Sequence, residues 1–265
     1  MQNKFTMQSL RNKTGYICDM DGVIYHGDRL VKGAKQFVDW LKTENKKFLF
    51  LTNSSAKSPK ELRQKLARMG IDVAEDDFYT SAQATASFLA EQNPGSGVYV
   101  IGESGLINAL HDAGLHIDNV NPEYVVVGES RTYNFEQIEL AVHFVLNGAK
   151  LIATNSDLTG PSEKGIAPAC RALVAPIELA TNRKAYFIGK PNPLMMRHAI
   201  KKIGCRREET LIIGDRMDTD IIAGIESEIE TALVLSGITK KEDLALFPYQ
   251  PDHILEKAAD ILLDS

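Results

Sequence analysis

The sequence contains few cysteines, no long apolar run and no strong excess of either charge. Its three cysteines, Cys18, Cys170 and Cys205, lie far apart in 265 residues and fit no zinc-binding spacing. Because their number is odd and their spacing has no pattern, a reducing cytoplasm is expected rather than a disulfide framework. No apolar run approaches the about 20 residues of a membrane-spanning helix, and the first residues lack the apolar segment of a secretory signal. We therefore expect a cytoplasmic protein with no membrane partner.

Charge and motif patterns exclude further classes of protein. The chain has 30 basic and 35 acidic residues, a net charge of −5, and no basic stripe, so no nucleic-acid polymer is expected as a partner. None of the six histidines has a metal-ligand spacing with another. The segment 102–105 lacks the third glycine of a dinucleotide fingerprint, and no suitable acid follows it. NAD binding is therefore not expected.

Short apolar runs with the pattern of β-strands alternate with helical patterns along the chain. This order is typical of an α/β protein with a mainly parallel sheet. The clearest helix signal begins at Ser58, where Pro59 suits the first helical position and Glu61 completes a capping box; Gly70 fits the helix end. The predicted strands span residues 16–20, 47–52, 98–101, 124–127, 151–154, 185–188, 211–214 and 232–235.

The polar residues at strand ends indicate how the chain is divided. They follow strands near both ends of the sequence, whereas the strands between residues 98 and 154 largely end without them. We therefore predict a Rossmann-like catalytic core built from residues 1–89 and 185–265, with residues 90–184 forming an inserted α/β cap domain. In parallel sheets the carboxyl ends of the strands face the ligand crevice, so side chains placed there are expected at a functional site.

Asp19 and Asp21 lie at the end of an apolar run that is typical of a buried strand, and Gly22 ends this strand at once. Two carboxylates at such a place need a cation or a proton to coexist. A divalent metal ion, with one acid as nucleophile and the other as acid/base, satisfies both needs. In phosphoryl transfer Asp19 would attack phosphorus and form an aspartyl-phosphate. Asp21 would protonate the leaving group and then deprotonate the incoming water, while Asp215 could complete a Mg²⁺ site with Asp19.

Three residues at other strand ends could bind the phosphate. Lys190 offers a point charge, and the Thr52 hydroxyl and the backbone or side chain of Asn53 can donate to phosphate oxygens. Each of these features alone also has an ordinary structural interpretation. Two aspartates can cap a helix or lie in a solvated turn, Thr52 and Asn53 can shape a turn, and Lys190 can be an exposed lysine. Their value comes from their order along the chain.

Several other polar residues keep two interpretations. Asp220 could be a metal ligand, a helix N-terminal acid or a partner that holds Lys190 or a metal-bound water, and we favour the last. Asn155 and Asp157 follow a predicted cap strand and could contact substrate or form a plain turn. Arg131 could contact the far end of a substrate or form a surface salt bridge.

The ordered set of motifs resembles the haloacid dehalogenase (HAD) superfamily of phosphohydrolases. The resemblance implies that Asp19 is the nucleophile, and that Asp21 is the acid/base and a metal ligand through its backbone carbonyl. It also implies that Asp215 is a ligand of Mg²⁺. The matching residues are Asp19-Met20-Asp21-Gly22 for the first motif, Thr52 for the second, Lys190 for the third, and Gly214, Asp215 and Asp220 for the fourth.

The long stretch between Asn53 and Lys190 resembles the superfamily branch with a large C2-type cap, and the segments 127–134, 153–157 and 233–237 resemble its NagD-like subgroup. This likeness covers nearly the whole chain after residue 14. It implies a Mg²⁺-dependent phosphatase of small phosphorylated metabolites, with nucleoside 5′-monophosphates as the first expectation. Sugar or other small-metabolite phosphates remain alternative substrates, and a phosphomutase and a non-enzymatic phosphoacceptor switch remain alternative functions. A homo-oligomer remains an alternative to a monomer. Asp21 argues against the switch, because an acid/base would hydrolyse the chain's own acyl-phosphate.

One position departs from the resemblance. Similar sequences usually carry Ala-Gly where this chain has Ser227-Glu228, at a predicted helix end. A glycine there commonly adopts positive φ, so Glu228 would cost about 1 kcal/mol if the backbone were kept.

Overall fold

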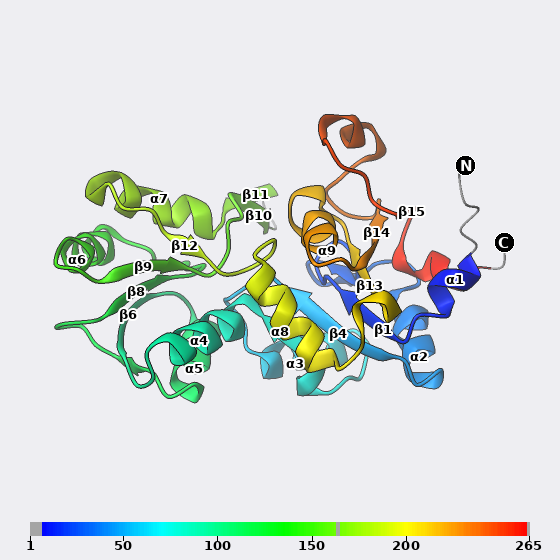
Figure 1. Ribbon diagram of the computed structural model, residues 1–265, viewed down its shortest axis with the longest axis horizontal. Helices are drawn as coiled ribbons and strands as arrows, with labels where there is room; N and C mark the ends of the chain where they lie inside the picture. The colour runs from blue at the N-terminus through cyan, green and yellow to red at the C-terminus, as the bar shows by residue number, and fades with distance from the viewer. Residues whose placement is uncertain (1–6, 163–164, 264–265) are drawn as a thin grey trace. The chain divides into compact units, whose positions relative to one another are not determined.

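The computed structural model of the protein describes residues 7–162 and 165–263 (Figure 1). Within it the chain forms two compact units. The first unit comprises Met1–Leu51, Arg63–Phe78 and Met196–Ser265, and the second comprises Thr52–Leu62 and Tyr79–Met195. Parallel sheets flanked by helices confirm the predicted α/β class. The assignment of residues 90–184 as a cap domain stays a prediction.

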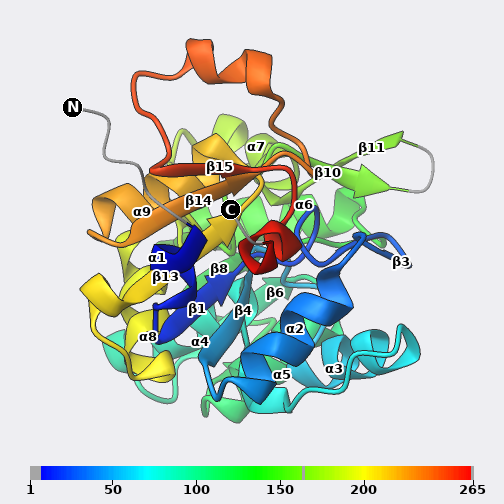
Figure 2. The same ribbon diagram turned by 90° about the vertical axis from the view of Figure 1, so that its right-hand side faces the viewer.

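A six-stranded sheet with the order β15-β14-β13-β1-β4-β5 contains the strands from the two ends of the chain (Figure 2). Strand β1 pairs in parallel with β13 on one side and β4 on the other, and Cys18 lies opposite both Ile213 and Phe50. The strands β1 and β13 are buried along their whole length, which explains their continuous apolar sequences. The strands are β1 (Gly15–Cys18), β4 (Lys47–Thr52), β5 (Phe78–Thr80), β13 (Thr210–Gly214), β14 (Glu230–Val234) and β15 (His253–Leu255).

The helix after β4 begins as the capping signal predicts. The backbone N–H and the hydroxyl of Ser58 each donate to the Glu61 carboxylate at 2.8 Å, and Gly70 has a φ of 86° just beyond the helix. The helix with this capping signal is α3 (Pro59–Arg68). The other helices in residues 7–68 and 193–226 are α1 (Met7–Arg11), α2 (Ala34–Thr43), α8 (Pro193–Ile203) and α9 (Ile222–Glu226), and a small hairpin consists of β2 (Tyr25–His26) and β3 (Arg29–Leu30). Short 3₁₀ helices span Glu75–Asp77, Arg207–Glu209, Lys241–Leu246 and Ala258–Leu262, and a short π-helical turn spans Met217–Ile221.

The second unit is built on a five-stranded sheet with the order β12-β9-β8-β6-β7. Its neighbouring strands pair in parallel, with α4 and α5 on one face and α6 and α7 on the other (Figure 1). Apolar side chains from β6, β8, β9, α6 and α7 form its core. The elements are α4 (Ser81–Gln92), β6 (Gly97–Ile101), α5 (Ser104–Asp112), β7 (His116–Ile117), β8 (Tyr124–Val127), α6 (Phe135–Leu146), β9 (Lys150–Ala153), β10 (Thr159–Ser162), β11 (Gly165–Pro168), α7 (Cys170–Thr181) and β12 (Tyr186–Phe187).

All eight predicted strands are present, and their ends differ from the predicted ones by at most two residues. Sequence patterns missed β5, β7, β15 and the hairpin β2-β3, whose strands have only two or three residues and are too short to show a periodicity. They also missed the hairpin β10-β11, whose four-residue strands contain no apolar run. The sequence predicts that the strands between residues 98 and 154 largely end without polar side chains. Two polar residues nevertheless lie close behind them, Glu129 two residues after β8 and Asn155 two residues after β9.

Two findings bear on the expectations for membrane and redox state. Among the described residues, the structure contains no helix that is both long enough and apolar enough to cross a bilayer. Cys18, Cys170 and Cys205 are all free thiols, and the first two are buried. The sequence predicts that the cysteines form no disulfide framework, and the three free thiols are consistent with this prediction.

Candidate active site

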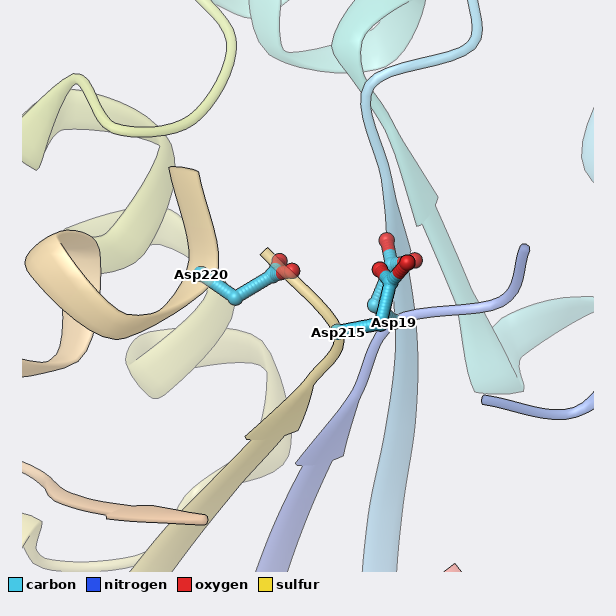
Figure 3. A group of neighbouring side chains, drawn as sticks. All are labelled: Asp19, Asp215 and Asp220. Carbon is cyan, nitrogen blue, oxygen red and sulfur yellow. The ribbon is translucent and has the colours of Figure 1, made fainter. Parts of the chain in front are cut away.

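Three aspartates converge at one edge of the six-stranded sheet. Asp19 directly follows β1 and Asp215 directly follows β13, so the parallel pairing of these strands brings the two side by side. Asp220 comes from the helical turn Met217–Ile221. One carboxylate oxygen of each residue lies within 4.8 Å of the others, and Figure 3 shows the three side chains pointing toward one another. The structure therefore forms a cluster of three carboxylates from residues distant in sequence.

Glycines provide the space that this cluster needs. A Cβ atom on Gly237 would lie 2.0 Å from Asp215 Oδ2, and one on Gly214 would lie 2.1 Å from the Cβ of Asp220. A Cβ on Gly22, whose φ is 83°, would lie 2.5 Å from Asp215 Oδ2. Larger residues at these positions would push the carboxylates out of place.

Backbone hydrogen bonds orient the cluster further. The N–H of Ile238 donates to Asp215 Oδ2 at 2.7 Å, and the N–H of Arg216 donates to Asp220 Oδ2 at 3.1 Å. Asp215 and Asp220 are almost completely buried. Buried carboxylates this close repel one another unless a cation or proton lies between them. An all-oxygen set of this kind suits a hard divalent cation such as Mg²⁺, so the residues present fit the ion that the sequence predicts.

Asp21 lies outside the group of three carboxylates that the described residues form. It forms an isolated β-bridge with Tyr25. The metal contact expected of Asp21 is through its backbone carbonyl, so the position of its side chain does not test that role.

The residues expected to bind phosphate belong to the second unit. Thr52, Asn53 and Lys190 are each at least nine-tenths buried. Asn53 Oδ1 accepts the backbone N–H of Lys190 at 2.7 Å, and Asn53 Nδ2 donates to the Lys190 carbonyl at 3.0 Å. The Thr52 hydroxyl accepts the N–H of Ser54 at 3.1 Å. The structure thus joins Asn53 directly to Lys190.

Sequence reasoning missed the carboxylate that holds the segment after β4. Glu129 Oε2 accepts the backbone N–H of Ser55 at 2.7 Å and its hydroxyl at 2.9 Å, and Glu129 Oε1 accepts Asn155 Nδ2 at 3.2 Å. Burial raises the pKa of Glu129, against these hydrogen bonds, which lower it. The signal that could have found Glu129 is its place two residues after β8, at the same kind of strand end as the predicted site residues.

The side chain of Asn155 is fully buried, and its amide donates to the backbone carbonyl of Asn53 at 2.8 Å. Asn155 therefore supports the segment after β4 from within the second unit. Asp157 Oδ2 accepts a hydrogen bond from Asn53 Nδ2 at 3.1 Å. Arg131 uses its backbone N–H to bind Glu103 Oε1 at 2.7 Å.

Comparisons with known families, relatives and solved structures agree with the resemblance found in the sequence. Residues 16–116 match the model of the haloacid dehalogenase-like hydrolases, and residues 187–261 match a HAD-hydrolase-like model. The chain is 45% identical to a dihydroxyacetone phosphatase of Corynebacterium glutamicum (strain R), over 93% of this chain and 90% of that protein. It is 43% identical to the ribonucleotide monophosphatase NagD of Escherichia coli (strain K12), over 92% and 96% of the two chains.

A third relative is the acid sugar phosphatase of Staphylococcus saprophyticus, 38% identical over 96% of this chain and 98% of that protein. The solved structure of NagD from Escherichia coli K-12 matches with a TM-score of 0.88 and 41% identity, covering 94% of this chain and 98% of that one. The chain therefore belongs to the haloacid dehalogenase-like hydrolases. Within them it is a NagD-like phosphatase, a phosphomonoesterase that acts on small phosphates.

Proposed function

We propose that this phosphatase depends on Mg²⁺ and hydrolyses nucleoside 5′-monophosphates through an aspartyl-phosphate on Asp19. The observation that carries the proposal is the convergence of Asp19, Asp215 and Asp220, whose carboxylate oxygens lie within 4.8 Å of one another. HAD phosphatases generally use Mg²⁺, and this donor set suits it. Bound there, the cation would offset the repulsion between the carboxylates and a phosphate dianion.

In this mechanism Asp19 and Asp21 divide the work. The Asp19 carboxylate attacks phosphorus, and the bond to the leaving oxygen breaks as the acyl-phosphate bond forms. Asp21 gives its proton to that leaving oxygen. It then takes a proton from the water that hydrolyses the acyl-phosphate and regenerates Asp19. One acid can serve twice because the leaving alcohol and the incoming water occupy the same position.

Thr52, Asn53 and Lys190 are proposed to bind the phosphate group. Lys190 supplies positive charge, the Thr52 hydroxyl can donate to a phosphate oxygen, and Asn53 can donate through its backbone N–H. The support from the structure is that Asn53 and Lys190 are hydrogen-bonded to each other and buried together. Asp215 and Asp220 are proposed to complete the Mg²⁺ site with Asp19 and the backbone carbonyl of Asp21.

The substrate is proposed by similarity. A relative named ribonucleotide monophosphatase supports nucleoside 5′-monophosphates, whereas relatives named dihydroxyacetone phosphatase and acid sugar phosphatase support triose or sugar phosphates as the second candidate. All three relatives are named phosphatases, which favours hydrolysis over a phosphomutase or a phosphoacceptor switch. We further propose a cytoplasmic location, supported by the three free thiols.

The first experiment measures phosphate release from p-nitrophenyl phosphate, nucleoside monophosphates, dihydroxyacetone phosphate and sugar phosphates. Wild type and Asp19→Asn are compared with Mg²⁺ and with EDTA. Release that requires both Asp19 and Mg²⁺, with a nucleoside monophosphate as best substrate, supports the proposal. Equal release by Asp19→Asn would remove Asp19 as the nucleophile, and a triose or sugar phosphate as best substrate would favour the second candidate.

Exchange of residues 90–184 for those of a relative with another preference tests whether this proposed cap selects the substrate.

A further inference from the structure

The segment Thr52–Ser55, which contains two of the residues proposed to bind phosphate, is held by side chains that follow two strands of the second unit. Glu129 lies two residues after β8, and Asn155 lies two residues after β9. These strands pair in parallel with Val127 opposite Ala153, so the two side chains emerge next to each other. Glu129 Oε1 accepts a hydrogen bond from Asn155 Nδ2 at 3.2 Å. The two residues therefore form a polar pair at the carboxyl ends of their strands.

Glu129 fixes the end of this segment through Ser55. Its Oε2 atom accepts the backbone N–H of Ser55 at 2.7 Å and the Ser55 hydroxyl at 2.9 Å. In return, the backbone N–H of Glu129 donates to Ser55 Oγ at 3.2 Å. Ser55 is fully buried, and hydrogen bonds removed from water are electrostatically stronger than exposed ones. These bonds fix both the position and the orientation of the backbone at Ser55.

Asn155 fixes the peptide between Asn53 and Ser54. The carbonyl of Asn53 accepts hydrogen bonds from Asn155 Nδ2 at 2.8 Å and from the Ser81 hydroxyl at 2.5 Å. Because a peptide unit is planar, these bonds also set the direction of the Ser54 N–H. That N–H donates to the Thr52 hydroxyl oxygen at 3.1 Å. Since this oxygen already accepts a hydrogen bond, the Thr52 hydroxyl is oriented with its own proton pointing away from the Ser54 N–H.

Two glycines show how closely the segment is packed. A Cβ on Gly128 would lie 2.7 Å from Ser55 Oγ, and one on Gly189 would lie 2.6 Å from Asn53 Oδ1. Both distances are too short for a real side chain, so the backbone at each glycine meets the segment directly. The segment therefore has little room to move, and the orientation set by its hydrogen bonds is kept.

We propose that Glu129 and Asn155 are positioning residues that orient the Thr52 hydroxyl as a donor to the phosphate group. They act through Ser55 and through the peptide that follows Asn53. The inference rests on the proposed function, because it takes Thr52 as a phosphate ligand. Binding groups are effective only when neighbouring hydrogen bonds hold them in the productive geometry. Because every substrate carries the same phosphate group, the two residues should affect all substrates alike.

The effect of Glu129 and Asn155 should depend on the Thr52 hydroxyl, and a double-mutant cycle measures that dependence. The inhibition constant of inorganic phosphate is measured for wild type, Thr52→Val, Glu129→Gln and Asn155→Ala, and for the two double variants that contain Thr52→Val. We expect Glu129→Gln and Asn155→Ala each to raise this constant about tenfold. In the Thr52→Val background each should raise it less than about threefold. A loss of packing alone would persist in that background.

Substrates with different leaving groups give an independent measurement. With p-nitrophenyl phosphate and a nucleoside monophosphate, Glu129→Gln and Asn155→Ala should lower kcat/KM by the same factor. Ser55→Ala, which removes only a buried hydroxyl, should have a smaller effect of the same kind, and it keeps the test available if either of the other variants fails to fold. Glu178→Gln is the matched control, because Glu178 Oε1 also accepts a backbone N–H in the second unit, that of Ala185 at 2.9 Å. It should leave the phosphate inhibition constant unchanged.

Thr52→Val is the reference for the proposed function. If it raises the inhibition constant of phosphate and neither Glu129→Gln nor Asn155→Ala does, the positioning role is overturned and the proposed function stands. If these two variants act equally with and without the Thr52 hydroxyl, or change kcat/KM for one substrate only, the positioning role is likewise overturned. If Thr52→Val leaves the inhibition constant unchanged, Thr52 is not a phosphate ligand, and this part of the proposed function falls together with the inference.

Discussion

The side-chain amide of Asn53 pairs with both backbone groups of Lys190. Oδ1 accepts the Lys190 N–H at 2.7 Å, and Nδ2 donates to the Lys190 carbonyl at 3.0 Å. Asn53 Nδ2 also donates to Asp157 at 3.1 Å. The Asn53 side chain therefore fixes the backbone of Lys190. The backbone N–H of Asn53 is the group proposed to bind a phosphate oxygen.

This pairing predicts that Asn53→Ala weakens phosphate binding through Lys190. We expect the inhibition constant of inorganic phosphate to rise about tenfold in Asn53→Ala, because one misplaced charge-assisted contact is worth about 1.5 kcal/mol. In a Lys190→Ala background the same change should have little further effect. Phosphate inhibition of the four proteins completes the cycle. Full additivity of the two substitutions would show that the Asn53 side chain binds phosphate independently of Lys190.

A second prediction concerns the space beside Asp215. Because a Cβ on Gly237 would lie 2.0 Å from Asp215 Oδ2, Gly237→Ala should displace that carboxylate and weaken the proposed Mg²⁺ site. The Mg²⁺ concentration for half-maximal phosphate release should rise by about tenfold or more, equivalent to about 1.4 kcal/mol. Titration of Mg²⁺ into the assay measures this directly.

Gly160→Ala is the matched control for this prediction, because a Cβ there would meet no atom within 4 Å. It should leave the Mg²⁺ requirement unchanged. An unaltered Mg²⁺ requirement in Gly237→Ala would mean that Asp215 is not needed to hold the ion.

The sequence predicted the strands and their polar ends well because buried parallel strands have continuous apolar sequences. The pattern placed Asp19 and Asp215 at the ends of predicted parallel strands, and the structure pairs these two strands directly. Asp220 was different. It lies on a single helical turn, and its approach to the other two carboxylates depends on the absence of a side chain at Gly214, a contact that no periodicity contains. The sequence favours a supporting role for Asp220 because it does not contain the distance that places this carboxylate beside those of Asp19 and Asp215.

The supporting residues were harder to predict for a related reason. Glu129 and Ser55 are 74 residues apart, and their hydrogen bonds exist only because the chain returns to the same place. The contact of the Lys65 Nζ atom with the Tyr25 ring, 3.6 Å from the ring centroid, likewise joins a helix to a two-residue strand. Such contacts depend on tertiary packing, whereas a motif is visible only when its residues are neighbours in sequence.

Glu129 leads to a prediction on pH. Its pKa is raised, chiefly by burial, so the folded protein binds this proton more tightly than the unfolded chain does. The contribution of Glu129 to the free energy of unfolding should therefore fall as the pH rises from about 4.5 through the raised value, and be constant above it. Urea unfolding of wild type and Glu129→Gln at several pH values measures the difference between them. That difference should move in favour of Glu129→Gln as the pH rises, whereas a pH-independent difference would contradict the raised pKa.

Glu228 yields a prediction about stability alone. Its φ is 58°, the left-handed conformation predicted from the departure at this position, and a non-glycine residue there costs about 1 kcal/mol. Its ion pair with Arg207, at 3.0 Å, is largely exposed and contributes little. Glu228→Gly should therefore raise the melting temperature by about 2 °C without changing kcat or KM. Glu228→Ala removes the same charge but keeps the strained backbone, so it should not stabilise the protein. Equal stabilisation by the two variants in thermal unfolding would assign the effect to the charge, whereas stabilisation by glycine alone would assign it to the backbone.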